Sequence, residues 1–137
     1  MRSKKKKRII IIVLAVVAVI GVIVAFTNIN KYKTYQDKVE AMVFENIDFS
    51  SIPDGDYIGE SDTGVIYARV MVMIENGKLV NIDILEHRHE RGQAAEVITK
   101  SMVEEQRTDV DAIASATNSS KVIRKAVEDA LIGANDN

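Results

Sequence analysis

The stretch "VIYARVMVMIENGKLVNIDIL", residues 65–85, decides the fold. Apolar residues alternate with others over residues 65–74 and again over residues 78–85, which predicts two β-strands with one face toward a core. Asn76 and Gly77 stand between these runs, and both residue types tolerate the positive φ angles of a type I′ turn. The sequence therefore predicts an antiparallel β-hairpin.

Two helices are expected after the hairpin. The polar segment "EHRHERG", residues 86–92, ends the second strand. Residues 94–106 and 120–131 then repeat apolar positions at helical spacing, and Gly133 is a candidate C-terminal cap. Pro53, Asp54 and Gly55 are turn residues at the start of the domain. We expect a small α+β domain over residues 52–133, with an antiparallel sheet, a central hairpin and two packed helices.

The N-terminus predicts a membrane anchor. Residues 2–8, "RSKKKKR", carry six positive charges, and residues 9–26 carry none. Eighteen apolar residues are long enough to span a bilayer, and the basic cluster favours a cytoplasmic N-terminus with the rest of the chain extracytoplasmic. A cleavable signal peptide is the alternative, but "AFTNINKYK" offers no small-x-small cleavage site. We expect residues 1–26 to be an uncleaved single-pass anchor in the cell membrane, in contact with lipid.

Residues 27–51 form the expected connection between anchor and domain. Tyr32, Tyr35, Val39, Met42 and Val43 fall at helical spacing, which predicts an amphipathic stalk helix. Its apolar stripe can pair with a second copy or fold back onto the domain. We expect the second arrangement.

Composition excludes several classes of function. The N-terminal cluster holds six of the 18 basic residues, which leaves 12 against 20 acidic residues and a formal charge of −8 on the exported part. That charge argues against nucleic acid as a partner. The chain has no cysteine, which excludes disulfides, thiolate metal sites and iron–sulfur clusters.

The segment "SATNSS", residues 115–120, gathers five hydroxyl or amide side chains where the last helix is expected to begin. One interpretation is helix capping by Thr117 or Ser119. The other is that one hydroxyl is a chemical handle beside the free N–H groups and positive dipole end of a helix, where a phosphate binds well.

Three segments resemble the FMN-binding domain family, which includes flavin-carrying subunits of sodium-pumping NADH:quinone oxidoreductases and of Rnf-type complexes. They are "DGDYIGE" at 54–60, "VMIENGKLVNIDILEH" at 72–87 and "VDAIASATNSSKVIRKAVEDAL" at 110–131. The family motif has Asp, three variable residues, Gly or Ser, then Ala and Thr, which Asp111, Ser115, Ala116 and Thr117 match. Ala112 and Ala114 depart from it, since Gly and Ser or Thr are common there.

The resemblance implies that FMN is joined through its phosphate to the Thr117 hydroxyl by a flavin transferase, which uses FAD with Mg²⁺ and releases AMP. Asp111 would belong to the stretch that the transferase recognises. Small Ala116 would leave the threonine hydroxyl open to attack. The residues expected around the FMN phosphate are Ser115, Ala116, Thr117, Asn118, Ser119 and Ser120.

We expect a membrane-anchored extracytoplasmic flavoprotein that acts as an electron carrier. Its redox partner would lie in or at the membrane. We do not expect an enzyme with its own substrate pocket. The alternative is a non-redox accessory or sensory module that holds FMN loosely or not at all.

Two other sets of residues are given lesser roles. His87 and His89 lie two apart at a strand end, but without a further ligand we interpret them as part of a solvated loop and expect no metal site. The loop that continues to Gly92 is expected to approach the flavin. Asp54 and Asp56 are interpreted as turn residues rather than a catalytic pair.

Overall fold

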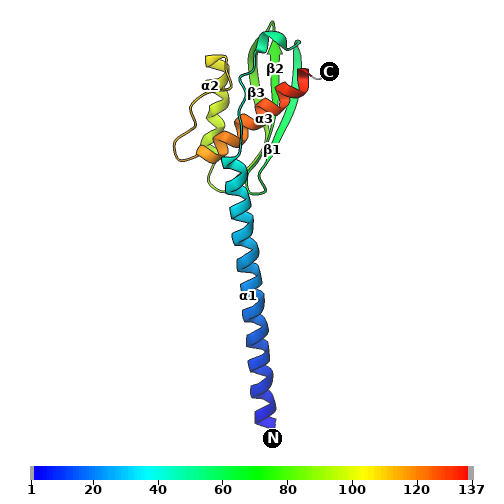
Figure 1. The fold of residues 1–137 in the computed structure, drawn as a ribbon, viewed down its shortest axis with the longest axis vertical. Helices are drawn as coiled ribbons and strands as arrows, with labels where there is room; N and C mark the ends of the chain where they lie inside the picture. Colours follow the sequence, from blue (N-terminus) through cyan, green and yellow to red (C-terminus); the bar gives the residue numbers. More distant parts are fainter. Residues whose placement is uncertain (1, 136–137) are drawn as a thin grey trace. The chain divides into compact units, whose positions relative to one another are not determined.

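The computed structural model describes residues 2–135, which form a long helix followed by an α+β domain (Figure 1). The chain divides into two compact units, residues 1–34 and residues 35–137. The elements in chain order are α1 (Arg2–Glu40), the 3-10 helix η1 (Phe49–Ser51), β1 (Gly55–Asp62), β2 (Tyr67–Glu75), β3 (Lys78–Arg88), the 3-10 helix η2 (Gln93–Val97), α2 (Ile98–Glu105) and α3 (Thr117–Asn135).

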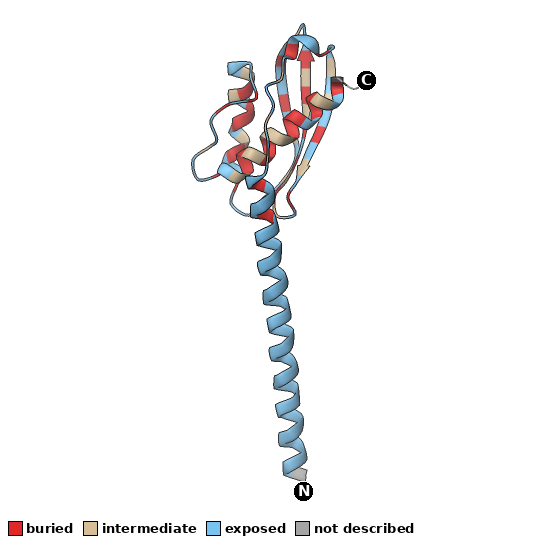
Figure 2. Cartoon of the chain, in the orientation of Figure 1, coloured by how far each residue is buried: buried red, intermediate tan, exposed pale blue. Residues whose placement is uncertain are grey.

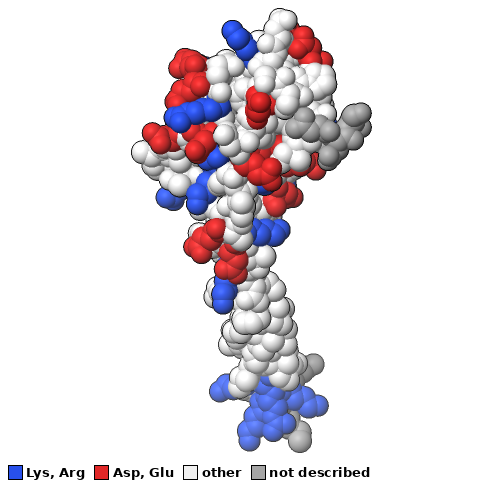
Figure 3. Space-filling view, turned by 45° about the horizontal axis from the view of Figure 1, so that its top comes forward, with Lys and Arg blue, Asp and Glu red and all other residues white. Residues whose placement is uncertain are grey.

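The first unit is the N-terminal part of α1, and the apolar residues that the structure describes in it are all exposed (Figure 2). Lys and Arg gather at the start of the helix, and an uncharged stretch follows (Figure 3). The most apolar 18-residue window has a mean hydropathy of 3.5, and none of it is buried. This helix is long and apolar enough to cross a membrane. Both a membrane anchor and a signal sequence have these properties.

The expected stalk helix is the continuation of α1 and not a separate element. Helix α1 runs without a break to Glu40, so the helical part of the stalk ends before Met42 and Val43. Tyr35 and Val39, at the start of the second unit, are buried in the core of the domain, and Met42 packs partly against it. Val43 is 73% exposed. The expected packing of the stripe onto its own domain is confirmed for three of its five residues.

The sheet has three antiparallel strands in the order β1-β2-β3. Strands β2 and β3 form the predicted hairpin, with Glu75 opposite Lys78 and Val72 opposite Ile82. Asn76 has φ 51° and Gly77 has φ 71°, as the predicted type I′ turn requires. The hairpin prediction is confirmed. Strand β3 continues through Glu86 and His87 to Arg88, so the prediction that the polar segment 86–92 ends the strand after Leu85 was wrong.

Strand β1 was not predicted from the sequence. Pro53, Asp54, Gly55 and Asp56 are interpreted from the sequence as turn residues, yet the strand begins at Gly55 and runs to Asp62. Asp56 therefore lies in β1, and its interpretation as a turn residue was wrong. Its residues pair along the whole of β2, from Gly55 opposite Ile74 to Asp62 opposite Tyr67. The pairing with β2 therefore determines this strand, because its own apolar alternation is weak.

Helix α3 packs across β1 and β2. A Cβ at Gly59 would lie 2.2 Å from Ala126 O and from Ala130 N, so only glycine lets the helix backbone approach the strand this closely. Glu60 N donates to Asp129 Oδ2 at 3.0 Å and ties the same two elements together. The predicted apolar stripe of this helix is confirmed, and its residues are all at most 2% exposed: Val122, Ile123, Ala126, Val127, Ala130 and Leu131.

Both ends of α3 differ from the prediction. The helix begins at Thr117, three residues before the expected start at 120. It also continues through Gly133 to Asn135, so the prediction that Gly133 is a C-terminal cap was wrong. Ala134 is buried at 7% exposure, which shows that packing extends the helix past the glycine.

The predicted helix over residues 94–106 is a 3-10 turn, η2, followed by α2. Ala95, Ile98 and Met102 are buried, as the pattern predicted. Gln106 ends α2 in a left-handed conformation with φ 54°. Its side chain accepts from Leu79 N at 3.1 Å and donates to Leu79 O at 2.7 Å, which joins the end of α2 to strand β3.

Candidate functional site

Thr117 is the first residue of α3. The sequence predicts a position just before the helix instead. The residue is exposed. Among the described residues, its hydroxyl has no hydrogen-bond partner. The Thr117 hydroxyl is therefore accessible from solvent and is not engaged in holding the fold together.

The start of α3 has the properties of an anion site. Ser120 N donates to Ala116 O at 2.9 Å and makes the first helical hydrogen bond, which leaves the N–H groups of Thr117, Asn118 and Ser119 without intrahelical acceptors. The first turn contains no acidic residue. The free N–H groups and the positive end of the helix dipole both favour a phosphate next to the Thr117 hydroxyl.

A tight turn leads into this helix. Ala116 N donates to Ile113 O at 3.0 Å, and Ser115 within the turn has a left-handed φ of 67°. This conformation favours glycine, so serine adopts it at a cost in free energy. Ala116 is buried at 6% exposure, so its small side chain fits below the turn while Ser115 and Thr117 stay exposed.

Ser120 holds the turn in place from inside the helix. Its Oγ accepts from Ile113 N at 3.0 Å and donates to Ala116 O at 2.9 Å, and the residue is 1% exposed. Ser119 is also buried, at 2% exposure. The structure thus separates the six candidate residues: Ser115 and Thr117 face solvent, Asn118 is half-buried, and Ala116, Ser119 and Ser120 lie inside.

Asn118 connects the site to the end of α1. Its Nδ2 donates to the Tyr35 hydroxyl at 2.7 Å, and Tyr35 is 6% exposed. Sequence reasoning placed Tyr35 on the apolar stalk stripe and missed this contact, because residues 83 apart in the chain give no local signal. Tyr35 therefore orients the second residue of α3.

The loop after β3 packs against the same helical turn. A Cβ at Gly92 would lie 1.8 Å from Ser119 Oγ and 2.6 Å from Ser119 Cβ. This close approach brings the backbone of the "RHERG" segment to the start of α3. A role of this loop beside the flavin stays a prediction.

The capping interpretation is not supported by this geometry. The residue before the helix is Ala116, which has no side-chain oxygen. Within the described part of the chain, neither Thr117 nor Ser119 makes a side-chain hydrogen bond to the first turn. The one hydroxyl that bonds to backbone here is that of Ser120, and it bonds backwards to the preceding turn.

Asp111, the expected transferase-recognition residue, is exposed on the segment that precedes the tight turn. Nearby Asp109 forms an ion pair with Arg124 of α3, with Oδ1 and Nη1 2.8 Å apart. The pKa of Arg107 is raised, first by its hydrogen bond to Glu105, and the charge of Asp111 adds to this effect. The recognition role of Asp111 stays a prediction.

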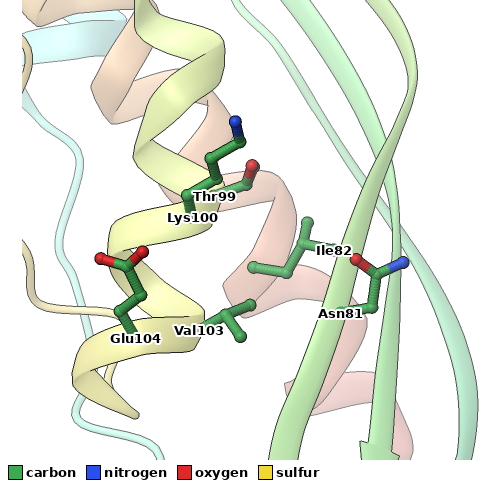
Figure 4. Close-up of a pocket in the computed structure, with 6 residues that line it drawn as sticks. All are labelled: Asn81, Ile82, Thr99, Lys100, Val103 and Glu104. Atoms are coloured by element: carbon green, nitrogen blue, oxygen red, sulfur yellow. The ribbon is translucent and has the colours of Figure 1, made fainter.

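An open groove of about 260 Å³ lies between β3 and α2 (Figure 4). Ligand pockets usually have volumes of about 300–1,000 Å³. None of the residues that line it comes from α3 or from the turn before it: Asn81, Ile82, Thr99, Lys100, Val103 and Glu104. The groove is too small and too open to enclose a flavin ring by itself.

The sequence model of the FMN-binding domain family matches residues 64–132, half of the chain, including all of β2, β3, η2 and α2 and most of α3. The chain belongs to the FMN-binding domain family. Its cofactor is FMN. A comparison with curated proteins gave no match. Strand β1 precedes the matched range, although it pairs with β2 and packs under α3, so the folded FMN-binding domain begins before residue 64.

The residues at the start of α3 fit an FMN phosphate. Three backbone N–H groups are free, the first turn has no carboxylate to repel an anion, and the exposed Thr117 hydroxyl stands beside them. Buried Ala116 places no bulk over that hydroxyl. The fit concerns the phosphate end of the cofactor only.

Proposed function

We propose that this FMN-binding protein is a membrane-anchored extracytoplasmic electron carrier whose FMN is attached covalently to Thr117. The observation that carries the proposal is the exposed and unpartnered Thr117 hydroxyl at the N-terminus of α3. Such a position combines an accessible nucleophile with a ready-made phosphate site.

The attachment is a phosphoryl transfer with FAD as donor. Thr117 Oγ1 forms an ester bond to the phosphorus on the FMN side of the FAD pyrophosphate. The bond from that phosphorus to the AMP oxygen breaks, AMP leaves, and the threonine proton goes to solvent or to a base of the transferase. The chain supplies the oxygen and the N–H groups of the first turn of α3, and the transferase supplies Mg²⁺ to offset the phosphate charge.

Covalent attachment suits a domain outside the membrane. A weakly bound cofactor would be lost by dilution there, while an ester bond keeps the domain loaded. Flavin supplies one- or two-electron chemistry, and the chain positions it and sets its surroundings. In this proposal the bound flavin exchanges electrons with other proteins. The chain therefore needs no pocket for a substrate of its own.

The N-terminal helix is the proposed anchor that keeps the carrier at the membrane. Its apolar window is uncharged and follows a basic cluster, which favours a cytoplasmic N-terminus. We expect the mature protein in the membrane fraction to begin near residue 1. Recovery of a soluble protein whose N-terminus lies near residue 27 would overturn this part of the proposal.

Denaturing gels read for flavin fluorescence test the attachment. The full chain is expressed with a flavin transferase, and intact mass is measured in parallel. We expect a mass increase equal to FMN minus water and a fluorescent band that Thr117→Val abolishes, because valine keeps the shape but has no oxygen. Ser115→Ala is the matched control, since Ser115 is the neighbouring exposed hydroxyl.

Fluorescence in Thr117→Val that is lost in Ser115→Ala would move the attachment to Ser115. A wild-type chain that never becomes fluorescent would leave the loosely binding accessory module as the function. For electron transfer, the loaded chain is mixed with membranes of its host and NADH, and flavin absorbance near 450 nm is followed. We expect bleaching on the order of seconds, in the range of ordinary enzymatic turnover, and its absence would contradict the carrier role.

A further inference from the structure

The two histidines of the chain, His87 and His89, and Glu96 lie together at the end of β3. One ligand atom from each residue lies within 4.8 Å of the other two. His87 Nδ1 and Glu96 Oε1 are 3.0 Å apart, and the two imidazole rings have centroids 4.4 Å apart. Sequence reasoning missed Glu96 because it belongs to the next element, η2.

The surroundings of His87 differ from those of a solvated loop. Its side chain is 2% exposed, and Glu96 beside it is 38% exposed. Its Nε2 atom is buried and has no hydrogen-bond partner among the described residues. Buried side-chain nitrogens are nearly always paired with protein, water or an ion, so this unpaired atom points to a ligand.

We propose that His87, through Nε2, and His89 bind a divalent transition-metal ion of the Zn²⁺ type. Glu96, whose Oε1 lies 3.0 Å from His87 Nδ1, would accept a hydrogen bond from that nitrogen and orient the ring, as carboxylates do for metal-binding histidines. Two imidazoles leave the other positions of a tetrahedral ion open to water. Imidazole nitrogen favours Zn²⁺, Cu²⁺ or Ni²⁺ over Mg²⁺ and Ca²⁺, which prefer oxygen. The site is separate from the flavin-attachment chemistry and does not depend on it.

Binding would change one identifiable hydrogen bond. His89 Nδ1 accepts from Gly92 N at 3.0 Å. If His89 binds the ion through Nδ1, the ion replaces this hydrogen bond. If it binds through Nε2, the ring proton moves to Nδ1, which can no longer accept. Both geometries release the Gly92 amide, which makes that amide a reporter of the site.

The ion would also act on the start of α3. Gly92 lies against Ser119, so the loop that carries His89 is in contact with the helical turn that begins at Thr117. An ion bound between His87 and His89 would join this loop to the end of β3. The proposed site is therefore a structural clamp beside the flavin-attachment turn.

Calorimetric titration with ZnCl₂ tests the proposal. The full chain is prepared in detergent without flavin, without a histidine tag and after treatment with a chelator. We expect one Zn²⁺ per chain, with affinity lowered at least about tenfold in His89→Ala and in Glu96→Gln, as is typical when a ligand or its orienting partner is removed. Glu104→Gln is the matched control, because Glu104 is an acidic helix residue outside the cluster, and its affinity should equal that of the wild type.

Nuclear magnetic resonance gives a second reading that does not depend on whether a variant folds. Because the chain has two histidines, imidazole ¹⁵N signals report on this pair alone. We expect saturating Zn²⁺ to shift the signals of both rings and of the Gly92 amide, and Mg²⁺ to leave them unchanged. Unshifted imidazole signals, or binding of equal affinity in His89→Ala, would overturn the proposal.

Discussion

Gly92 and Ser119 approach so closely that a Cβ on residue 92 would lie 1.8 Å from the Ser119 Oγ atom. One residue lies in the loop after β3 and the other in the first turn of α3. The contact joins the histidine-bearing loop to the helix that begins at Thr117. The segments that carry the two proposed sites therefore meet at one close packing contact.

We expect Gly92→Ala to destabilise the domain by about 1–3 kcal/mol, the usual cost of overpacking. Gly92 has φ −97°, so alanine is strained by contact with Ser119 and not by its backbone angle. Urea unfolding of the chain in detergent measures the change. The double variant Gly92→Ala/Ser119→Gly removes the clash, and it should be more stable than the sum of the two single changes predicts.

Position 115 tests the turn that leads into the site. Ser115 has φ 67°, which glycine adopts without cost from a Cβ. Ser115→Gly should raise the free energy of unfolding by about 0.5–1 kcal/mol, and Ser115→Val should lower it by about 1–2 kcal/mol. Flavin fluorescence on denaturing gels should persist in Ser115→Gly. Loss of fluorescence there, with Thr117 intact, would mean that the serine hydroxyl takes part in attachment.

The hydrogen bond from Asn118 to Tyr35 offers a double-mutant cycle. Tyr35→Phe removes the acceptor oxygen from a site that is 6% exposed, and should cost about 0.5–1.5 kcal/mol. Asn118→Ala should cost a similar amount, and the double variant should show a coupling of about 1 kcal/mol. Unfolding by urea gives all three values. Strictly additive effects would show that the two side chains do not interact in solution.

Glu128 is a fully buried carboxylate in α3, and it holds the segment after α1. Its Oε1 accepts from Arg124 Nε at 3.3 Å, and its Oε2 accepts from Glu45 N at 3.3 Å and lies 3.5 Å from Lys125 Nζ. Glu128→Gln would remove the buried charge beside Arg124 and Lys125, while Arg124 keeps its ion pair with Asp109 and Lys125 its hydrogen bond to Val43 O.

We therefore expect Glu128→Gln to destabilise the domain by about 1–3 kcal/mol, because Arg124, Lys125 and the Glu45 N–H each lose a charged acceptor in a buried site. Asp129→Asn is the matched control on the neighbouring position. Asp129 is exposed and can still accept from Glu60 N as an amide, so its change should cost less than about 1 kcal/mol. Equal effects of the two changes would contradict this account of the buried network.

The sequence by itself determined the features that depend on neighbouring residues. The hairpin follows from Asn76-Gly77 between two alternating runs, and the buried stripe of α3 follows from helical spacing. The motif around Thr117 indicated the FMN-binding domain family. The motif can be recognised in the sequence because its residues lie within seven positions, from Asp111 to Thr117. The apolar helix at the N-terminus could be predicted from the composition and length of its segment alone.

Only the tertiary structure decided what depends on partners far away in the chain. Strand β1 exists because it pairs with β2 and receives α3 at Gly59, and α3 continues past Gly133 because Ala134 is buried. Glu96 joins the histidines, and Tyr35 meets Asn118, through contacts that no local pattern encodes. The physical reason is that packing free energy over the whole domain exceeds the small local preferences of single residues.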